Sequence, residues 1–230
     1  MKAMIFSDLV TSKNSLASLF GITAFVSLFI AFTTETLVVA VACMAAMIPF
    51  MYLFSIAAYD EQNDWERFRL TLPISRKQVA YGRYASMAII SLCSLGAAVV
   101  LGIVVGLAAD ALPAGSVPQG LALSEFSIPI ILEVAVFTQL IIMIAALFTL
   151  PLIMRFGMTK GSRIVPIVLV LALSTGAALF SNSIDSSVIG SFFGDANAIL
   201  LSLVVACVVV IVLYVASALL SARLYEQREL

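Results

Sequence analysis

The stretch Ala198–Ser221, AILLSLVVACVVVIVLYVASALLS, runs for 24 residues without a charged side chain. About 20 apolar residues in a helix are enough to cross the hydrocarbon core of a bilayer, which is roughly 30 Å thick. A backbone in hydrocarbon must satisfy its own hydrogen bonds, so a span is either a helix or a strand of a closed barrel. Barrel strands alternate apolar and polar residues, whereas this run is continuous. The stretch therefore predicts a transmembrane helix.

The rest of the chain has the same character. Of its 230 residues, 63% are hydrophobic and 11% are charged, whereas soluble domains carry about 25% charged residues. The mean hydropathy is +1.16. The sequence predicts an all-α membrane protein with six transmembrane helices, formed by residues 1–230 as a single domain. The predicted spans are Ser15–Thr33, Leu37–Ala58, Tyr84–Ala109, Phe126–Met154, Ile164–Ser181 and Ala198–Ser221.

The basic residues indicate how the spans are oriented. All 12 Lys and Arg residues fall before the first span, between the second and third, between the fourth and fifth, or after the sixth. Short cytoplasmic loops retain Lys and Arg, so we expect both termini and the loop 59–83 in the cytoplasm. The charged residues in the loops on the opposite side are all acidic. They are Glu35, Asp110, Glu125, Asp185 and Asp195.

The N-terminal segment 1–14 is predicted to be an amphipathic helix lying in the membrane interface and leading into the first span. Its apolar side would carry Met4, Phe6 and Leu9 or Val10, and its polar side Lys2, Asp8 and Lys13.

The loop between the second and third spans contains the most polar segment of the chain, Asp60–Tyr84, DEQNDWERFRLTLPISRKQVAYGRY. Asn63 is a suitable N-cap with the acidic Glu66 three residues later, and Pro73 cannot continue a helix. This pattern predicts a short helix covering roughly Asp64–Leu72.

Trp65, Phe68 and Leu72 form one apolar stripe on this short helix, because they are three and four residues apart. After the proline, Ser75 and Gln78 form an S-x-x-Q capping box, which predicts the start of a second helix that continues into the third span. The residues alone are compatible with two roles for the short helix: an anchor in the membrane interface, or a contact for a partner protein.

The pattern N-x-W-E-x-F, followed by L-x-L-P-I-S-R-x-x-V and then R-Y, resembles the first cytoplasmic loop of ABC type-2 transporter permeases, in particular a subfamily that includes bacterial peptide and toxin exporters. The N-terminal MKAMIFSDL is similar to the opening segment of that family. The resemblance implies an ABC-2 type permease fold in which the loop holds a coupling helix that docks on a separate ATPase subunit. The contact residues it implies are Asp64, Trp65, Glu66, Arg67, Phe68, Arg69, Leu72, Arg76 and Lys77.

The resemblance also implies a second permease, as a homodimer or heterodimer, and amphipathic peptides or lipids as substrates. The chain itself has no GxxxxGK[ST] motif for ATP and no histidine for a Ser-His-Asp or Cys-His nucleophile. Its cysteines show no paired spacing, so no metal and no cofactor are expected. The charge balance does not favour nucleic acid as a ligand. The alternative function is a sensor or scaffold in the membrane whose loop binds a cytoplasmic partner without transport.

Polar residues inside the predicted spans are few. Glu133 is the ionisable residue well inside a span, and Gln139 lies on the same helix. An intramembrane carboxylate faces a cavity or a partner by default, so both residues are candidates for a transport pathway, although Glu133 is close enough to the outer end to reach headgroup water. The segment Arg155–Arg163 is predicted to be a second basic cytoplasmic loop. It is either a lesser contact for the ATPase or a positive-inside signal with a glycine-rich turn.

Overall fold

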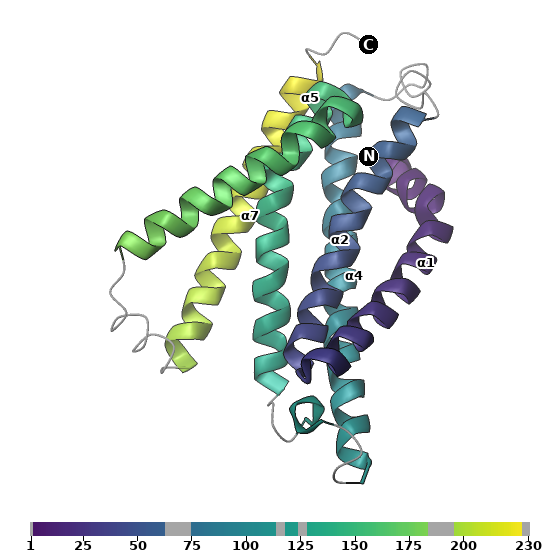
Figure 1. Cartoon of the computed structure of the whole chain (residues 1–230). Helices are drawn as coiled ribbons and strands as arrows, with labels where there is room; N and C mark the ends of the chain where they lie inside the picture. Colours follow the sequence, from purple (N-terminus) through teal and green to yellow (C-terminus); the bar gives the residue numbers. More distant parts are fainter. Residues whose placement is uncertain (1, 63–74, 114–117, 124–127, 184–195, 227–230) are drawn as a thin grey trace.

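The computed structural model describes residues 2–62, 75–113, 118–123, 128–183 and 196–226, and for 2–3, 14, 56–57, 60–62, 157–183 and 196 it describes the backbone only. This part of the chain is helical apart from short connections (Figure 1), which confirms the predicted all-α class for these residues. The helices are α1 (Lys2–Thr34), α2 (Leu37–Gln62), α4 (Arg76–Ala111), the 3-10 helix η1 (Gln119–Leu121), α5 (Ile128–Ser183) and α7 (Ala196–Glu226).

Five helical segments among the described residues are long and apolar enough to cross a membrane. They coincide with five of the six predicted spans. The remaining predicted span, Ile164–Ser181, falls in the second half of α5. The backbone is helical there, but the structure does not describe the side chains. The five segments are Ser15–Thr34, Leu37–Ser55, Arg76–Ala111, Ile128–Phe156 and Asn197–Glu226.

The connection after the fourth span differs from the prediction. The backbone of 155–163 is helical throughout, as part of the 56-residue helix α5, and not a loop with a turn. A glycine in a helix costs only about 1 kcal/mol relative to alanine, so Gly157 and Gly161 are too weak to end a helix with long apolar flanks. In Figure 1, α5 ascends beside α7, bends at the top of the view and descends again toward the left, where it ends to the left of α7.

Helix α2 is the centre of the bundle. It contacts α1, α4 and α5, and half of its most apolar stretch is buried, compared with 6% of the corresponding stretch of α7. Close packing of membrane helices needs small residues at the contacts. Gly102 of α4 is one of them, since a Cβ atom there would lie 2.7 Å from Cγ2 of Val41 and 3.0 Å from Cγ2 of Ile131. This glycine therefore allows α2, α4 and α5 to meet at one level.

The helix ends gather at two opposite sides of the bundle (Figure 1). The end of α2, the start of α4, the bend of α5 and the end of α7 lie at one side, and the α1–α2 turn, the end of α4 and the start of α5 lie at the other. The first side carries Arg76, Lys77 and Arg223, and the second carries Glu35 and Asp110. Charge is thus segregated as the sequence predicts, while the assignment of the basic side to the cytoplasm stays a prediction.

Candidate functional site

The start of α4 follows the loop that holds the predicted coupling helix. Ser75 is the N-cap: its Oγ accepts a hydrogen bond from the Gln78 N–H, and the Gln78 side chain accepts one from the Ser75 N–H. The capping box is therefore confirmed. The expected contact residues before it, Asp64, Trp65, Glu66, Arg67, Phe68, Arg69 and Leu72, lie outside the described residues.

The two remaining expected contact residues, Arg76 and Lys77, interact with the end of α7. Nη1 of Arg76 donates to the backbone oxygen of Glu226 at 3.1 Å, and Nζ of Lys77 lies 3.5 Å from the Glu226 carboxylate. The Lys77 and Glu226 side chains are 55% and 43% exposed, and an exposed ion pair contributes about 0–1 kcal/mol. This pair can therefore exchange for another acidic partner at little cost.

A second ion pair of α4 is buried. Nη1 of Arg83 lies 3.4 Å from Oδ2 of Asp8 on α1, with the two side chains 5% and 1% exposed. Asp8 was predicted on the polar side of an interfacial helix, whereas its side chain is buried against α4. A charge removed from water needs an opposite charge beside it, and the position of Arg83 on a neighbouring helix is not visible in the spacing of the sequence. Met4, which packs against Gly82, closes the same α1–α4 contact.

Gln139 is buried on the packed face of α5, together with Ala135 and Ala146. Among the described residues, neither atom of its amide group has a hydrogen-bond partner. Ile131 lies where α2, α4 and α5 meet. Gln139 is eight residues further along α5, a distance of about 12 Å along the helix. The bundle interior thus contains an unsatisfied amide, which costs about 1–3 kcal/mol if nothing binds to it.

Glu133 is partly exposed and lies five residues after the start of α5 at Ile128, or about 7.5 Å along the helix. Six residues separate it from Gln139, which places the two side chains about 120° apart around the helix axis at roughly 100° per residue. The structure therefore does not bring the two candidate pathway residues to one face.

The proline of α2 is compensated by a serine of α4. Pro49 has no N–H to donate to the carbonyl of Ala45, four residues earlier. Oγ of Ser94 lies 3.0 Å from that carbonyl oxygen and 3.1 Å from the carbonyl oxygen of Met44, and it shares its one hydrogen between them. Neighbouring helices commonly satisfy the backbone groups that a proline frees in a membrane helix, and here the contact fastens α2 to α4.

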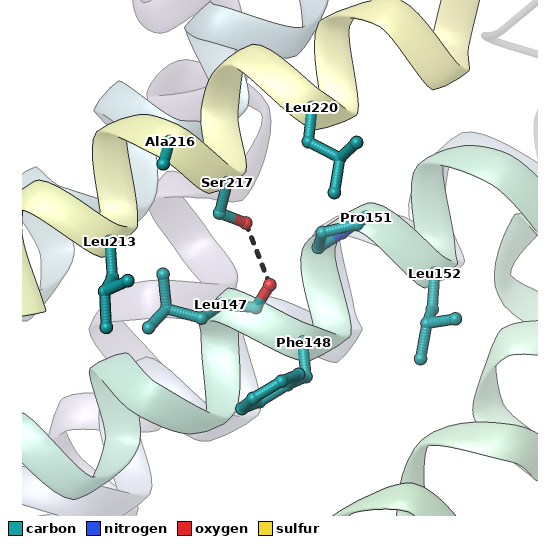
Figure 2. Close-up of a pocket in the computed structure, with 8 residues that line it drawn as sticks. All are labelled: Leu147, Phe148, Pro151, Leu152, Leu213, Ala216, Ser217 and Leu220. Carbon is teal, nitrogen blue, oxygen red and sulfur yellow. Dashed lines mark hydrogen bonds between the residues drawn. The ribbon is translucent and has the colours of Figure 1, made fainter.

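Pro151, one of the prolines of α5, has the same kind of compensation from α7. Pro151 frees the carbonyl of Leu147, and Oγ of Ser217 donates to it at 2.8 Å (Figure 2). The hydroxyl of Tyr84 lies 2.8 Å from Oγ of Ser217 and 2.7 Å from Oγ of Ser221. Because Ser217 gives its hydrogen to Leu147, Tyr84 must donate to Ser217 and accept from Ser221. An ordered chain of three hydroxyls therefore links α4, α5 and α7.

A groove of about 500 Å³ lies beside this contact, between α5 and α7. Figure 2 shows Leu220 of α7 directed toward Pro151 of α5 across it. Among the described residues that line the groove, only Ser217 has a polar side chain, and its hydroxyl hydrogen is already given to Leu147. The groove therefore offers an apolar surface. Its lining residues are Leu147, Phe148, Pro151, Leu152, Leu213, Ala216, Ser217 and Leu220.

The sequence matches the family described as ABC-2 family transporter protein over residues 3–226. The chain belongs to this family. No curated protein and no solved structure matches it. Membership of the ABC-2 transporter family, together with the apolar helices, makes the chain a multi-pass membrane protein. Members of this family are membrane components of transport systems and are not themselves the catalyst.

Several residues of this ABC-2 family chain that hold the helices together were not identified from the sequence. Ser94 and Ser217 are ordinary residues in apolar runs, and serine commonly occurs in membrane helices without a partner on another helix. One available signal is that each proline in a span requires a donor for the carbonyl four residues earlier. That signal predicts a donor without saying which helix provides it.

Proposed function

We propose that this chain is the membrane-spanning permease subunit of an ATP-binding-cassette transporter that exports or clears amphipathic peptides or lipids. ATP is hydrolysed on a separate cytoplasmic ATPase subunit, and a second permease, identical or different, completes the transporter. Membership of the ABC-2 transporter family supports the transport role and the partnership with an ATPase. The basic side of the bundle faces the cytoplasm in this proposal.

The proposal rests on how the loop 63–74 is connected to the helix bundle. The loop joins α2, the central helix, to α4. Helix α4 is tied to α1 through Arg83 and Asp8, and to α7 through Tyr84 and Ser217. A displacement of this loop by an ATPase would therefore reach four helices, which supports a coupling role for Asp64–Leu72.

The coupling role predicts that Trp65 and Phe68 enter an apolar groove on the ATPase. Loss of an aromatic anchor at an interface costs at least about 2 kcal/mol, which corresponds to a roughly thirtyfold loss of affinity. The double variant Trp65→Ala/Phe68→Ala should therefore fail to retain the ATPase in a detergent pull-down while still inserting in the membrane. The ATPase to be used is one encoded beside this chain.

A matched aromatic control is Phe29→Ala/Phe32→Ala, because both side chains are exposed near the opposite end of α1. This variant should retain the ATPase. If the Trp65→Ala/Phe68→Ala variant keeps both the ATPase and its permease-stimulated hydrolysis, the coupling role is wrong and the short helix is an interfacial anchor. If the unaltered chain binds no ATPase, the sensor or scaffold function takes precedence.

We place Gln139 on the transport pathway, with Glu133 near its outer mouth. The unsatisfied amide of Gln139 supports this, because it can donate to and accept from the polar groups of a passing substrate. The variant Gln139→Leu should raise the free energy of unfolding by about 1–3 kcal/mol, since it removes an unsatisfied buried group. The same variant should lower ATP-driven movement of a fluorescent amphipathic peptide in proteoliposomes roughly fivefold, the equivalent of one hydrogen bond of about 1 kcal/mol.

A packing role for Gln139 predicts a different result, because stability would then rise without any loss of peptide movement. Glu133→Gln provides the companion measurement: it should alter peptide movement at unchanged membrane abundance. Unchanged movement would leave Glu133 as a carboxylate that faces headgroup water.

A further inference from the structure

The apolar groove between α5 and α7 ends at two arginines. On α5, Arg155 follows Leu152 by three residues, and on α7, Arg223 follows Leu220 by three residues. Residues three or four apart lie one above the other on a helix. Each arginine therefore extends one wall of the groove toward the basic side of the bundle.

The two arginines are at nearly the same height. The hydrogen bond from Ser217 to the carbonyl of Leu147 aligns α7 with α5. Arg155 lies eight residues beyond Leu147 and Arg223 lies six residues beyond Ser217, which is about 12 Å and 9 Å along the two helices. A height difference of about 3 Å is small compared with the reach of an arginine side chain, so the two guanidinium groups can reach the same level along the groove.

Both arginine side chains are exposed. Neither has a carboxylate within ion-pairing distance among the residues that the structure describes, since Glu226, the nearest acidic residue on α7, pairs with Lys77 instead. The guanidinium of Arg155 lies 5.4 Å from the ring centre of Phe156, a contact that leaves its N–H groups able to donate. The guanidinium groups thus form a cationic end to an apolar groove.

We propose that this groove binds one membrane lipid with an anionic headgroup, with an acyl chain along α5 and α7 and the phosphate between Arg155 and Arg223. An acyl chain suits the groove because Ser217, the polar residue of its lining, already donates to Leu147. Arginine binds phosphate oxygens through two N–H groups at once. The lipid therefore belongs to the leaflet on the basic side and bridges α5 and α7 at the Pro151 contact. This proposal does not depend on transport or on an ATPase.

The test is a lipid titration of the purified full-length protein by native mass spectrometry. Phosphatidylglycerol and phosphatidylcholine with identical acyl chains are compared. A basic residue near a lipid surface favours an anionic lipid by about 1 kcal/mol, or roughly fivefold. The unaltered protein should therefore bind phosphatidylglycerol several-fold to about thirtyfold more tightly, and Arg155→Gln/Arg223→Gln should reduce this preference to near onefold.

Three variants and one competing ligand distinguish a lipid site in the groove from a general attraction of anions to the basic side of the bundle. Arg155→Lys/Arg223→Lys keeps the charge and should retain part of the preference, while Lys13→Gln, an exposed cation on α1, should retain all of it. Ala216→Trp, which fills the groove, should weaken the binding of both lipids. Glycerol 1-phosphate, which has the headgroup without chains, should not displace the lipid.

The proposal is overturned if the Arg155→Gln/Arg223→Gln variant keeps its preference or if Lys13→Gln loses it equally, because the preference would then reflect overall surface charge. Full displacement by glycerol 1-phosphate would make the site a phosphate site and not a lipid site. Undiminished lipid binding by Ala216→Trp would equally contradict an acyl chain in the groove.

Discussion

The first turns of α4 carry two ion pairs of nearly equal length and very different surroundings. Lys77 and Glu226 are 3.5 Å apart and about half exposed, whereas Arg83 and Asp8 are 3.4 Å apart and almost completely buried. Water screens the first pair, which is worth about 0–1 kcal/mol. Separating the second leaves a charge in an apolar interior, at about 3–5 kcal/mol. Burial, and not distance, therefore decides which of these contacts of α4 is costly to break.

The difference bears on how a signal from the loop 63–74 would spread. The buried pair fastens α4 to α1, so we expect these two helices to move together. The exposed pair joins α4 to the end of α7 weakly enough to be exchanged during a transport cycle. Breaking each pair separately tests this division.

The largest effect is expected for Arg83→Gln. The substitution leaves the carboxylate of Asp8 in an apolar site without its partner charge, so the free energy of unfolding should fall by about 3–5 kcal/mol. The measurement is a titration from mixed micelles into SDS, followed by circular dichroism.

The double variant Asp8→Asn/Arg83→Gln serves as the control for this prediction. Two neutral side chains of similar size avoid the unpaired charge, so most of the lost stability should return. A loss below about 1 kcal/mol for the single variant would show that Asp8 and Arg83 are no more strongly coupled than a surface pair.

The smallest effect is expected for Lys77→Gln. It should lower the free energy of unfolding by at most about 1 kcal/mol. Salt should reduce this difference further, because the Debye length falls to about 3 Å at 1 M ionic strength, while the effect of Arg83→Gln should hardly depend on salt. Equal salt sensitivity of the two variants, measured in the same titration, would contradict the contrast in burial.

The elements predicted correctly are those that depend on neighbours in the chain. The capping box at Ser75 and Gln78 involves two residues three positions apart, and each span follows from an uninterrupted apolar run. The loop predicted at Arg155–Arg163 is wrong because glycine and charge were given more weight than the helical flanks, which continue through this segment. The coupling contact at Asp64–Leu72 stays a prediction, since it lies outside the described residues.

The candidate site was predicted less completely. Arg76 and Lys77 lie at the basic side as expected, but their contact with Glu226 joins segments about 150 residues apart and has no local signal. Gln139 could be identified as polar within a span, and its separation from Glu133 around α5 follows from their spacing of six residues. Its lack of a hydrogen-bond partner, however, depends on how the helices pack.

The sequence by itself determined that the chain crosses a membrane, where most spans begin and end, how charge is divided between the two sides, and which loop resembles a coupling loop. These properties follow from hydrophobic length, short-range hydrogen bonding and the positions of Lys and Arg. The tertiary structure alone decided which helices are fastened together, through Asp8 with Arg83, Ser94 with Ala45 and Ser217 with Leu147. The reason is physical: in hydrocarbon every freed carbonyl or buried charge needs a partner, but only packing determines which helix supplies it.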